Sequence, residues 1–148
     1  MSIEKIINDA WEIKDQINKG SDKSITDAVK DILKDLDQGK IRVAEKVNGE
    51  WVTHQYIKKA IMLSFRTHEK EVLQGPYSSW TDLSVYLKGK TAGWGPEEFK
   101  KAGFRMLPNS PVRFGSFINK NAVLMPCFIN VGAYIDSNTM MDTFSRAG

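Results

Sequence analysis

The sequence predicts an α+β protein in which a mainly helical domain, residues 1–103, precedes the first coils of a left-handed parallel β-helix, residues 104–148. Two patterns lead to this division. In the first part apolar residues recur at helical spacing, as in amphipathic helices. After Gly103 an aliphatic residue returns about every sixth position, without period-two alternation. A triangular prism has about six residues per face, so this period favours a coil that packs against its own neighbouring turns.

The first forty residues predict two amphipathic helices. Apolar residues at positions 3, 6, 7, 10, 13 and 17 form one face of the first, and Gly20 ends that run. The second is expected from about Ser24, with Gly39 as its C-terminal stop. Its apolar face comprises Ile25, Ala28, Val29, Ile32, Leu33 and Leu36. These faces are expected to pack against each other or against a neighbouring subunit.

The middle of the chain combines a hairpin, a helix and loops. Asn48-Gly49 between β-prone runs indicates a hairpin near residues 41–53, because both turn residues tolerate positive φ. The segment QYIKKAIMLSF predicts a third helix, and residues 74–95 are expected to form loops with short turns. A brief helix follows, with Pro96 at its first position and Gly103 at its end.

The six-residue spacing continues through two series. Its aliphatic members are Val112, Ile118 and Leu124, then, after a slip of one residue, Ile129, Ile135 and Met141. A small residue lies four places after each of them except Leu124, where Phe128 stands. Six faces make two coils of the prism. The slip lies beside Pro126, which indicates a shortened face or a bent corner there. Two ordinary short strands are the alternative, because six-residue matches are degenerate.

Composition narrows the classes of function. Of 148 residues 41% are hydrophobic and 26% charged, with a net charge of +3 spread over the sequence. Without a basic block, no nucleic-acid or membrane partner is expected. The single cysteine, Cys127, permits no intrachain disulfide and fits a reducing, cytoplasmic location. No run reaches the ~18 apolar residues that cross a bilayer.

Several residues of chemically versatile types are assigned structural roles. His54 and His68 have no carboxylate or thiol spacing that suggests a metal site, and His54 is expected to open the third helix. Cys127 is expected to be a small core or edge residue of the coil rather than a nucleophile. The aromatic residues expected to anchor the loop-rich segment by packing are Tyr77, Trp80 and Trp94.

Three stretches together resemble one enzyme family. They are "GKIRVAEKVNGEWVTHQYIKKAIMLSFR" (39–66), "KKAGFRMLPNSPVRFGSFINKNAVLMP" (100–126) and "INVGAYIDSNTMMDTF" (129–144). They are similar to 2,3,4,5-tetrahydropyridine-2,6-dicarboxylate N-succinyltransferase, an acyltransferase of lysine and diaminopimelate biosynthesis. The resemblance covers the chain from about Gly39 and, more loosely, the helices before it. It implies a homotrimer that transfers succinyl from succinyl-CoA to the amino group of open-chain tetrahydrodipicolinate. Succinyl-CoA would be a co-substrate, with no permanently bound cofactor.

Two residues match substrate positions of the family. Arg105, in GFR, resembles the arginine that holds a substrate carboxylate, and a guanidinium suits bidentate carboxylate binding. Asp142, in MMDT, resembles the aspartate that meets the substrate amine, which a carboxylate can orient and deprotonate. Without the resemblance, Arg105 would be an ordinary ion-pair residue and Asp142 a turn residue that caps backbone N–H groups.

The end of the chain departs from the resemblance. Family members are considerably longer, and their CoA-binding residues, with a glutamate that shares the acid–base work, would lie beyond Gly148. The last residues, FSRAG, differ from the family pattern, and Arg146 is unexpected in a continuing coil. We therefore expect a fragment or a frame change, weak or no activity alone, and a last coil that is frayed, paired with another chain or held by trimer contacts. The alternatives are a non-catalytic trimeric interaction module and, less favoured, a different hexapeptide acyltransferase.

Overall fold

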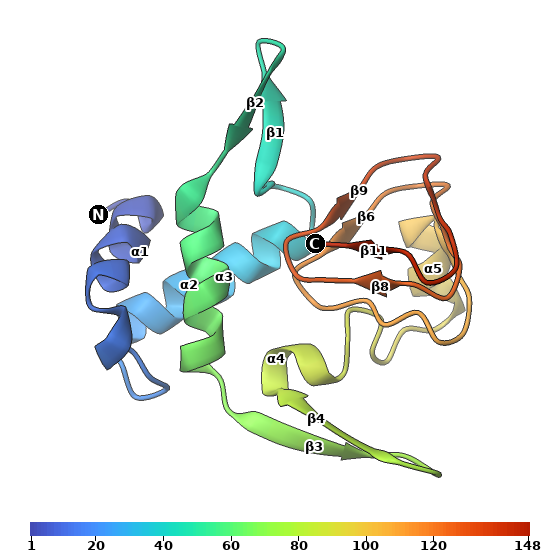
Figure 1. The fold of residues 1–148 in the computed structure, drawn as a ribbon, viewed down its shortest axis with the longest axis horizontal. Helices are drawn as coiled ribbons and strands as arrows, with labels where there is room; N and C mark the ends of the chain where they lie inside the picture. Colours follow the sequence, from blue (N-terminus) through green and yellow to red (C-terminus); the bar gives the residue numbers. More distant parts are fainter.

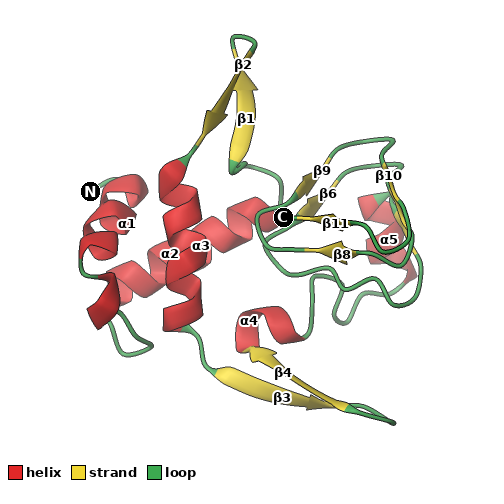
Figure 2. Ribbon diagram, in the orientation of Figure 1, coloured by secondary structure: helices red, strands yellow, loops and turns green.

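The computed structural model describes residues 1–148. Three helices occupy one side of the molecule and a coil of very short strands the other (Figure 1). Two hairpins project from the helical part in opposite directions, and loops connect most of the strands in the coil (Figure 2). No helix is long and apolar enough to span a membrane.

Three helices form the first part. They are α1 (Ile3–Glu12), α2 (Lys23–Asp37) and α3 (Gln55–Thr67), with a 3-10 turn, η1 (Lys14–Gln16), after α1. Ser2 accepts a hydrogen bond from Lys5 N at the start of α1, and Asp22 accepts one from Ser24 N at the start of α2. The helix α1 ends earlier than the periodicity suggests, because the chain tightens into η1 after Glu12.

The apolar faces of these helices meet in one core. Its most enclosed side chains are Ile7, Val29, Ile32, Leu33, Ile57 and Leu63. The first two helices therefore bury their faces within the chain, against each other and against α3. Ser64 is also fully buried, and its hydroxyl shares a 2.6 Å hydrogen bond with the Tyr86 hydroxyl. Burial raises the pKa of Tyr86, so this phenol stays neutral inside the core.

Both hairpins are antiparallel. The first joins β1 (Ala44–Val47) to β2 (Glu50–Thr53), and positive φ at Asn48 and Gly49 confirms the predicted turn. The second joins β3 (Lys70–Gln74) to β4 (Ser79–Leu83), and a single turn, α4 (Ser84–Leu87), follows it. The prediction of loops with short turns was therefore wrong at Gln74 and over residues 79–87, whereas residues 75–78 do form a turn. Five residue pairs join β3 to β4, and this pairing holds the strands together although the segment is polar and rich in turn-forming residues.

The aromatic residues of this region have different environments. Tyr77, at the tip of the second hairpin, is 99% exposed and Trp80 is 53% exposed, so neither is the packing anchor that the sequence suggested. Trp94 is such an anchor, with its ring centroid 5.2 Å from that of Phe99 and 5.9 Å from that of Phe104. This aromatic cluster packs α5 (Pro96–Ala102) against the coil.

From Arg105 onward the chain forms a three-faced coil of parallel strand pairs. The strands are β5 (Arg105–Met106), β6 (Phe117–Ile118), β7 (Val123–Leu124), β8 (Phe128–Ile129), β9 (Tyr134–Ile135), β10 (Met140–Met141) and β11 (Arg146–Ala147). They pair as β5–β7–β10, β6–β9 and β8–β11. Phe117 pairs with Tyr134 and Arg105 with Val123, so the chain returns to the same face after a nearly constant length. The two-strand alternative does not fit these columns.

The six-residue series supplies the interior of the coil. Its first five members, Val112, Ile118, Leu124, Ile129 and Ile135, are at most 5% exposed, and Met141 is partly buried. The slip beside Pro126 changes one assignment. Phe128 points outward, and the buried Cys127, one residue earlier, fills the small position of that face. Burial raises the pKa of the Cys127 thiol, in keeping with the predicted core role.

The last face of the coil is hydrogen-bonded within the chain rather than frayed. Phe128 N donates to Ser145 O at 3.1 Å, and Asn130 N donates to Ala147 O at 2.8 Å. Arg146 lies at an exposed position of β11, where a charged side chain can remain in solvent. The charge that looked out of place in the sequence is thus compatible with the coil.

The helical part and the coil are joined through Asp37, the last residue of α2. Its Oδ1 lies 2.9 Å from Lys90 Nζ and accepts a 3.0 Å hydrogen bond from Gly115 N. Lys90 also donates to the Asp37 carbonyl oxygen at 2.7 Å. The side chains of Lys90 and Asp37 are only 6% and 18% exposed. One carboxylate therefore connects the end of a helix, the segment before α5 and a corner of the coil.

A second junction lies at Gly132, which has a φ of 86°. A Cβ atom there would lie 2.9 Å from Ile61 Cδ1 and 3.2 Å from Val43 Cγ2. Gly132→Ala is expected to lower the free energy of unfolding by about 1–3 kcal/mol, because the side chain meets both a strained backbone and these neighbours. Urea titration followed by circular dichroism measures the change.

Gly93→Ala is the matched control, because Gly93 also has positive φ, 76°, but a Cβ there would meet nothing within 4 Å. It should cost about 1 kcal/mol from the backbone conformation alone. Equal losses in the two variants would contradict a tight approach of the coil to α3 and to Val43, the residue before β1.

Candidate functional site

Arg105 opens the coil on an exposed outward position of β5. The chain turns into this strand at Gly103, which ends α5 with a φ of 75°, and the buried ring of Phe104 fixes the turn. The Arg105 backbone N donates to Ala122 O at 2.9 Å. Its guanidinium forms no ion pair in the chain, contrary to the ordinary surface role considered for it. It is thus available to bind an anion.

Asp142 follows β10 at an exposed corner of the coil. Its Oδ1 accepts a 2.7 Å hydrogen bond from Thr143 N, and its carbonyl oxygen accepts hydrogen bonds from Ser145 N and Ser145 Oγ. The residue therefore makes the turn contacts considered for it. The hydrogen bond at Oδ1 also restrains the carboxylate, and Oδ2 is left without a partner.

Arg105 and Asp142 belong to the same face of the coil but do not touch. Arg105 pairs with Val123, which pairs on its other side with Met140, two residues before Asp142. Adjacent strands are ~4.8 Å apart, so the two charged residues are separated by about 10 Å along the coil. Val123 lies between these two layers, and Met140, in the same layer as Asp142, is 59% exposed on the outer surface. A positive and a negative group at either end of an apolar strip suit a ligand with polar ends and a hydrocarbon middle.

This face is open to solvent. Five cavities of about 220 to 490 Å³ are lined by other residues, and by neither Arg105 nor Asp142. Sites that bind small molecules usually enclose most of the ligand surface. A binding site built on this face therefore needs a second wall that these residues do not provide.

The chain matches known proteins over nearly its whole length. Residues 2–67 match the family described as tetrahydrodipicolinate N-succinyltransferase N-terminal. The 2,3,4,5-tetrahydropyridine-2,6-dicarboxylate N-succinyltransferase of Pelagibacter ubique (strain HTCC1062) is 65% identical over 133 residues, which are 90% of this chain and 48% of that protein. The enzyme of the same name from Dechloromonas aromatica (strain RCB) is 43% identical over 148 residues, 99% of this chain and 53% of the relative.

The chain is similar to the N-terminal half of these succinyltransferases. A third relative of the same name, from Acinetobacter baylyi (strain ATCC 33305 / BD413 / ADP1), is 46% identical over 126 residues, 84% of this chain and 44% of its own. The chain spans about half the length of these relatives. The predicted resemblance is thereby confirmed.

The two histidines of the chain have structural partners. His54 precedes α3, as predicted, and its Nε2 lies 2.7 Å from Glu45 Oε1, which ties β1 to the helix. His68 ends α3, with its Nδ1 3.0 Å from Ser64 O. No group of three or more potential metal ligands gathers anywhere in the chain.

The sequence did not indicate a cavity of about 470 Å³ between the first hairpin, α3 and the coil. Its polar and aromatic lining residues are Arg42, Trp51, Lys58 and Tyr134. Arg42 and Trp51 belong to the region of the predicted hairpin, but Tyr134 comes from the coil. No spacing in the sequence could bring Tyr134 to them, because the contact depends on how the hairpin is placed against the coil.

Proposed function

We propose that the chain forms the acceptor-binding half of an enzyme that transfers succinyl from succinyl-CoA to the amino group of open-chain tetrahydrodipicolinate. The observation that carries the proposal is the 65% identity over 133 residues with a relative of that name. The open face with Arg105 and Asp142 at its ends supports it, because the acceptor carries both carboxylates and an amine. Succinyl-CoA is a co-substrate, and no cofactor is bound permanently.

The proposal includes the architecture. Residues 1–103 form an N-terminal, mainly helical domain, and residues 104–148 form the first coils of a left-handed β-helix of hexapeptide repeats. Parallel pairing at a nearly constant step along the chain and the inward aliphatic series support this assignment. The functional unit is a cytoplasmic homotrimer in which a neighbouring subunit supplies the second wall of the site.

In the proposed reaction Arg105 holds a carboxylate of the acceptor and Asp142 meets its amine. Asp142 orients the neutral amine through Oδ2 and accepts a proton as the nitrogen attacks the thioester carbonyl. The new C–N bond forms, the C–S bond breaks, and the CoA thiolate leaves and takes up a proton. Cys127 has no part in this chemistry, since the amine attacks the thioester directly and the thiol is buried.

A chimera tests the proposal. Residues 1–148 replace the matching half of the Pelagibacter ubique relative, and CoA thiol release is measured with succinyl-CoA and 2-aminopimelate. We expect Arg105→Gln to raise the KM for 2-aminopimelate roughly 10- to 100-fold, the loss of one charge-assisted contact. Asp142→Asn should lower kcat about 10²- to 10⁴-fold.

Asp136→Asn is the matched control for Asp142. Asp136 also lies at an exposed corner of the coil, and its Oδ1 accepts a hydrogen bond from Ser137 N at the same 2.7 Å. If Asp142 acts only as a turn residue, both variants will have similar kcat. A chimera that assembles like the relative but transfers no succinyl would overturn the proposal and favour the non-catalytic interaction module.

A further inference from the structure

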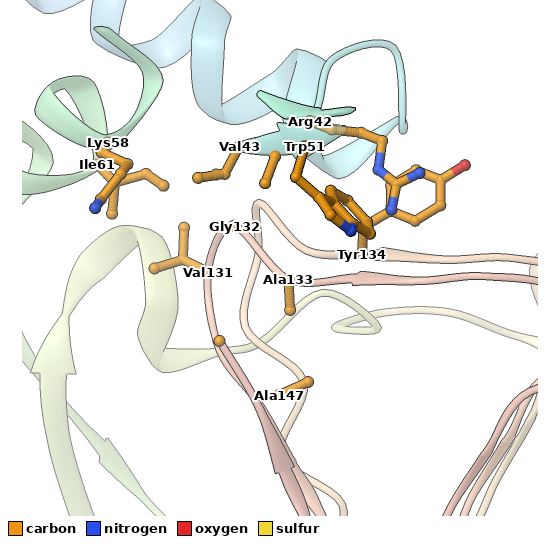
Figure 3. Close-up of a pocket in the computed structure, with 12 residues that line it drawn as sticks. Arg42, Val43, Trp51, Lys58, Ile61, Val131, Gly132, Ala133, Tyr134 and Ala147 are labelled. Atoms are coloured by element: carbon orange, nitrogen blue, oxygen red, sulfur yellow. The ribbon is translucent and has the colours of Figure 1, made fainter. Parts of the chain in front are cut away.

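A cavity distinct from the face of Arg105 and Asp142 lies where the first hairpin approaches the coil (Figure 3). Its volume is about 470 Å³, within the range of sites for small organic molecules. Its lining comes from the start of β1 and the segment before it, from β2 and α3, from the start of β9 and the corner before it, and from the end of the chain at β11. It shares neither Arg105 nor Asp142 with the proposed acceptor site.

One end of the cavity holds a stacked cation. The guanidinium carbon of Arg42 lies 3.7 Å from the centroid of the Tyr134 ring, and Figure 3 shows the two groups face to face. Arg42 Nε is buried and has no hydrogen-bond partner in the chain. A buried donor without an acceptor is costly, so an acceptor supplied by a ligand would be favourable here.

The charged side chains that line the cavity are both positive, and Gly148, the last residue of the sequence, also lines it. Lys58 projects from α3 toward the other end, and none of the 12 lining residues is Asp or Glu. Asp136 has a pKa lowered chiefly by its hydrogen bonds from Ser137 and Asn119, with a smaller contribution from Arg42, but it forms no ion pair with Arg42. Glu45 lines a separate cavity, which Arg42 also lines, and its Oε1 lies 2.7 Å from His54 Nε2.

The remaining walls are apolar. Trp51 lies beside the stacked pair in Figure 3 and is 65% exposed, so its indole face is available to a ligand. The aliphatic lining residues are Val43, Ala44, Ile61, Val131, Ala133 and Ala147. An aromatic ring can stack on the indole while a carboxylate accepts hydrogen bonds from the guanidinium.

We propose that this cavity binds a small planar aromatic carboxylate. The carboxylate accepts hydrogen bonds from the free donors of Arg42, and the ring lies against Trp51 and the aliphatic walls. A second carboxylate, where the ligand has one, is neutralised by Lys58. The charge of the lining selects an anion, and its aromatic and aliphatic surface selects a flat ring over a hydrated inorganic ion.

The test is a titration of the 148-residue chain with pyridine-2,6-dicarboxylate, without any CoA compound. Binding is measured by calorimetry and by chemical-shift changes of assigned backbone amides. We expect saturable shifts around Trp51, Lys58 and Tyr134, and at least tenfold weaker binding of the neutral pyridine-2,6-dicarboxamide. Arg42→Gln should weaken dicarboxylate binding at least tenfold, and Lys58→Gln or Trp51→Ala about three- to tenfold.

Arg105→Gln distinguishes this cavity from the proposed acceptor site. It should leave the affinity for pyridine-2,6-dicarboxylate unchanged, and that result holds whether or not the succinyl-transfer proposal is correct. The exposed Lys58 and Trp51 give variants that can be tested even if Arg42→Gln fails to fold. Absence of saturable binding, equal binding of the dicarboxamide, or a loss caused by Arg105→Gln alone would overturn the proposal.

Discussion

Replacing Asp37 with alanine is expected to lower the free energy of unfolding by about 3–5 kcal/mol, as for other buried ion pairs that lose one partner. The substitution leaves the Lys90 ammonium, 6% exposed, with a single carbonyl acceptor. It also removes the side-chain acceptor of Gly115 N in the coil. Urea denaturation followed by tryptophan fluorescence and circular dichroism measures the loss.

Asp35→Ala provides the comparison on the same helix. Asp35 lies 3.5 Å from Lys40, but both side chains are well exposed, at 40% and 61%, so its loss should cost at most about 1 kcal/mol. Both aspartates lie in the last turn of α2 and share the same helix dipole. In the double variant Asp37→Ala/Lys90→Met the buried charge is gone, and part of the stability should return. Equal losses for Asp37→Ala and Asp35→Ala would show that the junction is not held by this carboxylate.

Leu124→Ala is expected to destabilise the coil by about 2–5 kcal/mol, the range for buried leucines that leave a cavity. Leu124 is fully buried and lies in β7, the strand that pairs with both β5 and β10. Hydrogen exchange of the amides that bond across these strands, such as Leu107 N to Leu124 O and Met125 N to Met141 O, reports the local loss.

Met140→Ala is the matched substitution on the outer surface of the same face. Met140 is 59% exposed, and its removal should change the stability by less than about 1 kcal/mol. Similar losses of stability in Leu124→Ala and Met140→Ala would show that the buried Leu124 contributes no more to the stability of the coil than the exposed Met140.

The sequence predicted best those elements whose signals are local. Asn48-Gly49 specifies its own turn, and Pro96 and Gly103 delimit α5 with the residues that each end of a helix favours. The second hairpin was missed because its turn, Gly75 to Ser78, carries no such two-residue signal. Its strands are held by pairing across the hairpin, which composition alone does not disclose.

Periodicity predicted the interior of the coil but not its irregular corner. Counting four residues from Leu124 placed Phe128 at the position of a small residue. The face beside Pro126 is one residue shorter, so the buried Cys127 occupies that position instead. The acceptor-site residues were proposed from motifs, and only the coil register shows that Arg105 and Asp142 share a face. The stacking of Arg42 on Tyr134 depends on tertiary placement alone.

The nearly constant step along the chain between paired strands also bears on how the molecule folds. Each new layer closes a loop of the same modest length, so the entropic cost of adding a layer is nearly constant. Once α5 and the aromatic cluster around Trp94 hold the first layer, later layers can add in chain order, each on a template already formed. The coil can therefore grow by elongation from a nucleus, and its contacts of short sequence separation favour rapid folding.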